Sequence, residues 1–509
     1  MHSLSDIYGN ISIHSVLLWL ALMFLITGIF NKKSSLSIFS IIIIAIAWYQ
    51  MSSKLTAYSI SSIGVNMMLI SAIAYFGSRI KKLSAHLTYL VFASAIFLIA
   101  HSYTIQKASS SFSVNLPNES LDQEAELLVK FNSQSDLQKW ISSNKNSYDI
   151  IYPAFTPIDK SYSLDEYLIV NLKPTDDASE RIIELEKNEL VAYVEGNEIL
   201  ELKLPKQKSK KETSNTLSTN DPYSGKQWMA KKFDLEKFHN QLPKISALDS
   251  KKQSTIAILD TGVDSNHEDL SDNYISTSES YDNDKRGHGT HCAGIAAAVT
   301  GNKIGISSWI PSGASVKVTS IKVLSSSGIG SQRTIVNGIL EAADEGYDII
   351  SMSLGGRSNP NRERTYKDAV QYANDKGAIV IVAAGNSSMD AIAYSPANTP
   401  GVIAVSAIDS NLELADFSNK IDNITYGIAA PGTDIYSTLP DNRYGPQNGT
   451  SMAAPFVSGV VGLMRLYNPN LNTQQVYDYL RESAINNDGQ IIINPIGAFQ
   501  LMMQAAPAE

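Results

Sequence analysis

A serine lies in a run of small residues at Asn448-Gly449-Thr450-Ser451-Met452-Ala453-Ala454-Pro455, just before the apolar segment 456–466. Proline is tolerated in the first turn of a helix, because its missing N–H would have no helical partner there. The pattern therefore predicts a helix that begins near Ser451. Free N–H groups and the helix dipole favour a developing negative charge at such a position. This is a suitable place for a nucleophile whose reaction generates an oxyanion.

Two compact motifs upstream contain the partners that a nucleophilic serine needs, a base and a group that orients the base. Residues 256–264 (IAILDTGVD) predict a buried strand that ends at Asp260 and a glycine turn. Residues 286–294 (RGHGTHCAG) place His288 at the start of a helix rich in small residues. The order along the chain is therefore Asp, His, Ser.

These motifs resemble those of the subtilisin-like serine proteases, whose triad has the same order. The resemblance extends over about residues 220–500. It implies that Ser451 is the nucleophile, His288 the base and Asp260 the residue that orients the base. His291 is the other candidate base, but the family motif places the catalytic histidine first in His-Gly-Thr-His. Cys292 follows His291 directly, and we expect it to be a small buried hydrophobe.

The resemblance implies a serine endopeptidase that hydrolyses polypeptides through an acyl-enzyme intermediate. The alternative is a catalytically silent membrane receptor that uses the same fold to bind peptides. A covalent serine-directed fluorophosphonate separates the two, because only an activated serine reacts with it.

Further site residues are implied by the same resemblance. Asn386, in Ala-Ala-Gly-Asn after a predicted strand, matches the side-chain donor to the oxyanion, beside the Ser451 N–H. Two stretches match the edge strands that pair with an extended substrate: Gly328-Ile329-Gly330 and Ser353-Leu354-Gly355-Gly356. Tyr394 lies near the expected base of the primary specificity pocket, where a tyrosine would shorten that pocket.

A structural calcium ion is also implied. Asp269 matches a ligand of the family's strong calcium site, residues 300–306 resemble its loop with Asn302, and Asp221 would complete the site. Two carboxylates, an amide and several carbonyls suit a hard cation. Solvated turns are the alternative interpretation of these residues.

The composition limits the function classes. A chain of 509 residues exceeds the size at which single cores stop growing, so we expect several domains. A net charge of −9 argues against a nucleic-acid partner. The chain has one cysteine, which excludes an intramolecular disulfide framework.

Residues 1–104 predict a transmembrane region of four helices. Four apolar runs, at 11–30, 36–51, 60–76 and 86–103, approach the length that crosses a bilayer as a helix. Basic residues in the first and third loops place these loops in the cytoplasm by the positive-inside rule. We therefore expect a multi-pass protein of the cell membrane, with the lipid bilayer as a partner and an extracytoplasmic catalytic domain.

A linker at 105–120 leads to a small α+β domain at 121–204. Its predicted order of elements, β-α-β-β-α-β, is the split ferredoxin-like pattern, with residues 190–194 and 199–204 expected to close the sheet. Position and pattern resemble the propeptide of subtilases, which acts as folding chaperone and inhibitor. We therefore expect this domain to be a partner of the catalytic domain; an unrelated spacer is the alternative.

A polar, lysine-rich linker follows at 205–219, and we expect it to be exposed and cut by the protease itself. The catalytic domain is predicted at 220–502, with a tail at 503–509. Its alternating strands and helices predict an α/β fold in which helices cover both faces of a parallel sheet. Active residues should gather at the carboxyl ends of the strands.

Overall fold

A computed structural model describes residues 126–144, 148, 150–172, 178–205, 219–242, 253–358 and 363–505. They belong to one compact unit, residues 116–509. Within the described residues no helix is long and apolar enough to cross a membrane, which contradicts the predicted multi-pass localisation. The longest described helix, α13 (Thr450–Tyr467), has 18 residues and is buried in the protein core. The four apolar runs between residues 11 and 103 lie outside the described residues.

The larger sheet has eight strands in the order β17-β18-β14-β13-β11-β9-β6-β7. All neighbouring pairs are parallel except β17 with β18. The strands are β6 (Ser254–Asp260), β7 (Val316–Lys322), β9 (Ile349–Met352), β11 (Ile379–Ala383), β13 (Val402–Ile408), β14 (Gly427–Pro431), β17 (Ile485–Asn487) and β18 (Gln490–Ile492).

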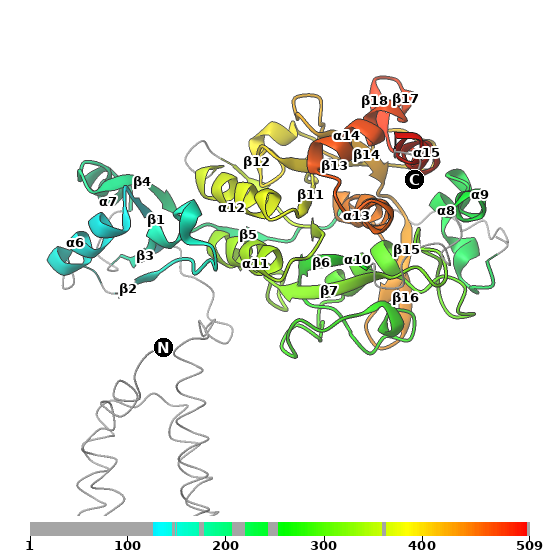
Figure 1. The fold of residues 1–509 in the computed structure, drawn as a ribbon, viewed down its shortest axis with the longest axis horizontal. Coiled ribbons are helices and arrows are strands. Elements are labelled where there is room, and N and C mark those ends of the chain that lie inside the picture. Colours follow the sequence, from blue (N-terminus) through cyan, green and yellow to red (C-terminus); the bar gives the residue numbers. More distant parts are fainter. Residues whose placement is uncertain are drawn as a thin grey trace, which may run out of the picture. The chain divides into compact units, whose positions relative to one another are not determined.

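Helices cover both faces of this sheet, and alternate residues of each strand show why (Figure 1). In β6, Ile256 and Ile258 join one apolar cluster, whereas Ala257 and Leu259 join another. Successive side chains of a strand point to opposite faces. The first cluster includes α10 (His288–Ala297) and α13, and the second includes α11 (Gln332–Asp344) and α12 (Glu363–Asp375). The predicted α/β architecture is confirmed.

Shorter elements complete the larger domain. They are the helices α8 (Trp228–Lys232), α9 (Leu235–Gln241), α14 (Thr473–Glu482) and α15 (Pro495–Ala505), and the strands β8 (Ile329–Ser331), β10 (Gly356–Arg357), β12 (Tyr394–Ser395), β15 (Ile435–Leu439) and β16 (Arg443–Gln447). β10 pairs with β12, and β15 pairs with β16.

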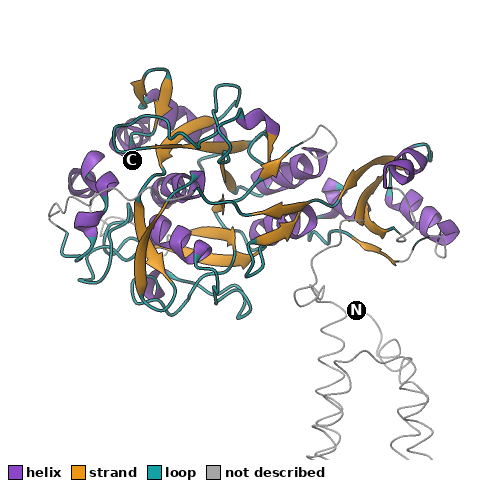
Figure 2. Cartoon of the chain, turned by 180° about the vertical axis from the view of Figure 1, so that it is seen from behind, coloured by secondary structure: helices purple, strands orange, loops and turns teal. Residues whose placement is uncertain are grey.

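The smaller sheet is antiparallel, in the order β2-β3-β1-β4. Its elements are β1 (Glu126–Phe131), α6 (Gln134–Asn144), β2 (Ile150–Pro153), β3 (Tyr167–Asn171), α7 (Ala178–Glu186) and β4 (Val191–Gly196), so the predicted ferredoxin-like order is present. One face packs under α6 and α7 around Trp140 (Figure 2). The other face, with Leu128 and Ile169, joins the cluster that contains α11 and α12.

Of the two segments that were expected to close this sheet, 190–194 does so through β4, whereas 199–204 does not. β5 (Ile199–Glu201) pairs antiparallel with β8, so that Leu200 lies opposite Gly330. Leu200 and Leu202 are buried in the cluster shared with α11 and α12. The apolar residues of this segment are thus buried as predicted, but against β8 and the apolar cluster beside it rather than in the smaller sheet.

Candidate active site

Asp260 and His288 meet at the carboxyl end of β6. Asp260 is the last residue of β6 and His288 the first of α10, and both are fully buried. The Nδ1 atom of His288 lies 2.8 Å from each carboxylate oxygen of Asp260. The Thr261 N–H also donates to this carboxylate, at 2.7 Å. These contacts fix the plane of the imidazole.

Asp284 is a supporting residue that the sequence analysis missed. Its buried carboxylate accepts hydrogen bonds from the Gly287 N–H at 2.8 Å and from the Thr290 N–H at 2.9 Å. It thereby satisfies free donors at the start of α10, as an N-terminal cap does. An acidic residue four positions before His288 was the available signal.

Ser451 is the second residue of α13 and is almost fully buried. Its hydroxyl donates to the carbonyl of Ser353 at 3.2 Å. In the described part of the chain, the Nε2 atom of His288 is buried and has no hydrogen-bond partner. This nitrogen is therefore free to accept a proton. Catalytic hydrogen bonds are often formed only once a substrate is in place.

Pro455 has a role that differs from the predicted one. The helix begins at Thr450, so Pro455 lies in its second turn rather than its first. Proline has no N–H to bond the carbonyl four residues earlier, which is that of Ser451. The Ser353 hydroxyl donates to this carbonyl at 2.7 Å, and the Cys292 thiol at 3.4 Å. The proline thus leaves the Ser451 carbonyl without a partner in its own helix, and the bonds from Ser353 and Cys292 to this carbonyl hold Ser451 in place.

His291 and Cys292 are buried residues of α10 with structural roles. The Nε2 atom of His291 lies 3.0 Å from the Gly445 carbonyl, and burial lowers the pKa of His291 to about 3. This imidazole therefore stays neutral in the core. Burial raises the pKa of the Cys292 thiol, which disfavours the thiolate that a cysteine nucleophile requires.

Asn386 lies after β11, directly beside the start of α13. Its amide oxygen accepts from the N–H and the hydroxyl of Thr450, at 2.9 and 3.0 Å, so its amide nitrogen is turned the other way. A side chain built on Gly449 would place its Cβ 3.5 Å from both that nitrogen and the Ser451 N–H. The two donors therefore face one small space, which Gly449 leaves open.

A carbonyl of the chain itself lies at this space. The Asn386 amide nitrogen donates to the Lys203 carbonyl at 3.2 Å. Upstream of Lys203, the Leu202 N–H donates to the Gly328 carbonyl at 2.8 Å, and β5 continues along β8. Residues 199–203 thus extend along the predicted substrate-pairing stretch 328–330 and end at the Asn386 amide.

The second predicted substrate-binding stretch lies close to the same site. Ser353 contacts Ser451 as described, Leu354 is buried among α11 and α12, and a Cβ on Gly355 would lie 3.1 Å from the Ser395 carbonyl. A Cβ on Gly356 would lie 3.4 Å from a methyl carbon of Leu200. The extended segment therefore passes between Gly330 on β8 and Gly356 on β10.

The Tyr394 ring packs against the turn that carries Asn386. The backbone of Gly385 has φ +104°, and a Cβ on it would lie 3.2 Å from the Tyr394 ring. The tyrosine is buried, and its hydroxyl contacts the Met389 sulfur at 3.5 Å.

The residues of the predicted metal site also come together. Asp221 and Asp269 are both buried, and within the described residues neither forms an ion pair. The Gly301 N–H donates to Asp221, and the Ile306 N–H and the Asn302 amide donate to Asp269 at 2.8 Å each. Burial, and to a smaller degree the Asp221 carboxylate, raises the pKa of Asp269 to about 7.

Such a buried pair of acids favours a cation. A cation there would take the amide oxygen of Asn302, which in this structure accepts from the Ile304 N–H at 2.7 Å. The donor set therefore fits calcium, provided that this amide rotates.

Comparison with known proteins assigns this arrangement to a family. The model of the subtilase family matches residues 251–498. Thermitase from Thermoactinomyces vulgaris is 42% identical over 255 residues, which are 48% of this chain and 84% of thermitase. The chain belongs to the subtilase family. This subtilase is also 42% identical to subtilisin DY from Bacillus licheniformis over 239 residues, 45% of this chain and 83% of that protein.

A subtilisin from Bacillus pumilus is 38% identical over 237 residues, 45% of this chain and 82% of that protein. Together with the geometry of Asp260, His288 and Ser451, these relatives make the chain a subtilisin-like serine endopeptidase. The interpretation as a silent receptor is not favoured.

The Asn386→Ala substitution tests the oxyanion role. Removing one donor of this kind lowers kcat by about 10²–10³, or about 2.7–4 kcal/mol, because the donor acts mainly in the transition state. We therefore expect kcat on a peptide substrate to fall by this factor with KM nearly unchanged. Asn411→Ala, in an exposed turn, is the control. A variant with full kcat would contradict the assignment.

Proposed function

We propose that this subtilase cleaves polypeptides with Asp260, His288 and Ser451 as its triad. The Ser451 hydroxyl attacks the carbonyl carbon of the scissile bond, and Nε2 of His288 takes the hydroxyl proton. The tetrahedral intermediate collapses to an acyl-enzyme when His288 gives this proton to the leaving amine. Water then attacks the ester by the reverse sequence of proton transfers. Asp260 keeps the proton on Nδ1 and stabilises the imidazolium.

The oxyanion of each tetrahedral intermediate would be stabilised by the Asn386 amide nitrogen and the Ser451 N–H. Thr450 orients the amide before any substrate arrives, since both of its donors hold the amide oxygen. Preorganised donors of this kind need no rearrangement during the reaction, which is why they contribute strongly to the rate.

The observation that carries the proposal is the position of the Lys203 carbonyl. It accepts from Asn386, and the strand that leads to it pairs with β8. An extended strand that ends with a carbonyl at the Asn386 amide is bound as a substrate would be. We infer that the chain cuts itself at the Lys203–Leu204 bond, which lies just before the linker 205–219 that the sequence predicted to be cut.

The region upstream of this bond would then act as a propeptide. It contacts the catalytic domain well beyond the groove: Asn337 donates to the Ala154 carbonyl at 3.2 Å, and Tyr167 donates to Asp368 at 2.6 Å. Phe155 and Tyr167 are buried in the cluster shared with α11 and α12. Contacts on this scale would keep the segment bound after cleavage, and thus inhibitory.

Self-processing is tested with the Ser451→Ala variant of the full chain. We expect the wild-type chain to yield a fragment that begins at Leu204, and the variant to remain intact, because only Ser451 supplies the nucleophile. Intact mass and N-terminal sequencing identify the bond. Ser280→Ala, an exposed serine, is the control.

Cleavage of the Ser451→Ala chain at the same bond would show that another protease acts there. A wild-type chain that remains uncut would refute self-processing, and its hydrolysis of added peptides would then show whether the triad works.

We further propose that Asp221, Asp269 and Asn302 hold a calcium ion. The support is that Asp221 and Asp269 are buried and, within the described residues, form no ion pair with a basic side chain. The Gly305 backbone also lies close to Asp269, since a Cβ on it would be only 2.1 Å from an oxygen of that carboxylate. The ion would tie the loop 301–306 to the segment at Asp221 and stabilise the fold. It has no part in bond cleavage.

Calcium should raise thermal stability. In the Ser451→Ala background, calcium at about 100 times its Kd should stabilise the fold by about 2.7 kcal/mol, which is roughly 3 °C in Tm for a unit of this size. Asp269→Asn should remove most of this shift, because it deletes a charged ligand. Asp272→Asn, an exposed acid nearby, should retain the shift. Equal Tm values with calcium and with a chelator would refute the site.

A further inference from the structure

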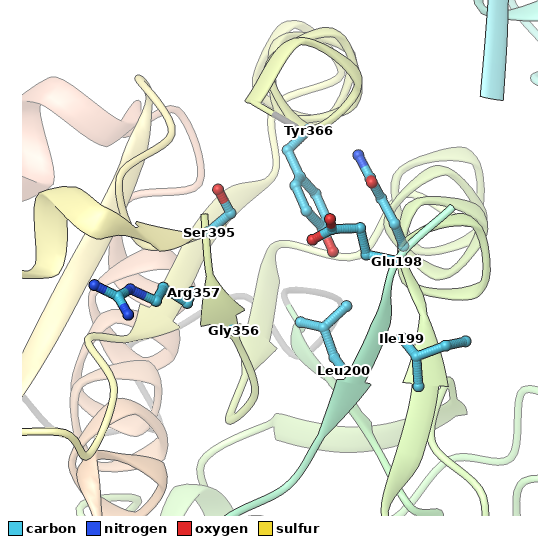
Figure 3. Close-up of a pocket in the computed structure, with 8 residues that line it drawn as sticks. Glu198, Ile199, Leu200, Gly356, Arg357, Tyr366 and Ser395 are labelled. Carbon is cyan, nitrogen blue, oxygen red and sulfur yellow. The ribbon is translucent and has the colours of Figure 1, made fainter. Parts of the chain in front are cut away.

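The groove that holds residues 199–203 has a cavity beside Leu200. The cavity has a volume of about 240 Å³. It lies between the strand that carries Leu200, the strand that carries Gly356, and helix α12 (Figure 3). The lining residues are Glu198, Ile199, Leu200, Gln332, Gly356, Arg357, Tyr366 and Ser395. The chain's own segment therefore does not fill the space that the groove offers at this position.

Tyr366 gives the cavity an unusual polar group. The tyrosine extends from α12 toward Leu200 and Glu198 (Figure 3). It is only 2% exposed, and within the described residues its hydroxyl has no hydrogen-bond partner. Burial raises the pKa of this hydroxyl, so the group stays protonated and can both donate and accept. A buried polar group without a partner is unfavourable by about 1–3 kcal/mol.

The pairing register of β5 with β8 shows which residue of a substrate would reach this cavity. Leu200 lies opposite Gly330 on β8, and Lys203, three residues later, places its carbonyl at Asn386. A substrate strand bound in the same way would direct its fourth residue before the scissile bond into the cavity. A leucine at this position cannot bond the Tyr366 hydroxyl, since its side chain has no polar atom.

We propose that Tyr366 is a specificity residue that selects a side chain with a polar tip, tyrosine in preference to phenylalanine, at the fourth position before the cut. The two side chains have nearly the same size and shape, so an apolar pocket would scarcely distinguish them. A pocket with an unpartnered hydroxyl distinguishes them, because only tyrosine supplies the missing hydrogen bond. Gln332, Arg357 and Ser395 also line the cavity. The inference rests on the proposed binding register.

The test uses peptides that differ only in this residue. Each contains X-Glu-Leu-Lys-Leu, with X as Leu, Phe or Tyr, and is offered to the self-processed protein after the cleaved N-terminal segment, which would otherwise occupy the groove, has been separated from it. Mass spectrometry locates the cut, and kcat/KM is measured for the Lys–Leu bond. One added hydrogen bond corresponds to roughly tenfold, so we expect kcat/KM for Tyr to exceed that for Phe by about this factor.

Two variants assign the preference to Tyr366. In Tyr366→Phe the ratio of kcat/KM for Tyr over Phe should fall to near one. In Tyr477→Phe, which removes a buried tyrosine hydroxyl on α14, the ratio should stay as in the wild type. A wild-type ratio near one overturns the inference even if Tyr366→Phe does not fold. A ratio that survives in Tyr366→Phe also overturns it.

Failure of the underlying function gives a different result. If no peptide is cut, the proposed peptidase mechanism fails and the inference falls with it. If peptides are cut at another bond, the triad works but the register is wrong. A uniform rate at the Lys–Leu bond for Leu, Phe and Tyr refutes the specificity alone.

Discussion

The close approach of helices α10 and α13 is the constraint on which the site depends. A Cβ on Gly459 would lie 2.5 Å from the Ala296 carbonyl, so only glycine permits the observed spacing at that point. A Cβ on Gly294 would similarly lie 2.1 Å from the Thr438 hydroxyl. His288 and Ser451 lie at the first turns of these two helices. Any side chain that separated the helices would also separate the base from the nucleophile, because packed cores do not deform freely.

One extended segment connects maturation, inhibition and specificity in this account. Residues 199–203 occupy the groove, present a carbonyl to Asn386 and place Leu200 beside a cavity that it does not fill. The contacts that would make the segment a substrate are the same ones that would make it an inhibitor after cleavage. A segment that left no unfilled space would bind more tightly and would be harder for a substrate to displace. The underfilled cavity is consistent with an inhibitor that can be removed.

The sequence predicted the architecture of the larger domain and the residues that meet in its site, since these depend on local motifs and on strand periodicity. It placed residues 199–204 in the wrong sheet, because an alternating pattern shows which residues are buried but not which strand edge they join. It missed Asp284, whose role depends on the loop before α10. The multi-pass localisation rested on apolar runs and on the basic residues between them, and no described helix supports it.

Labelling with a fluorophosphonate tests the central claim most directly, because the reagent reacts only with a serine that a neighbouring base activates. Once the cleaved segment has been separated from the processed chain, the account predicts one covalent adduct per chain, on the peptide that contains Ser451, and no adduct after His288→Ala. An unlabelled Ser451 in a folded, processed chain would contradict the account. So would an adduct that persists in the His288→Ala variant, since the activation would then not come from His288.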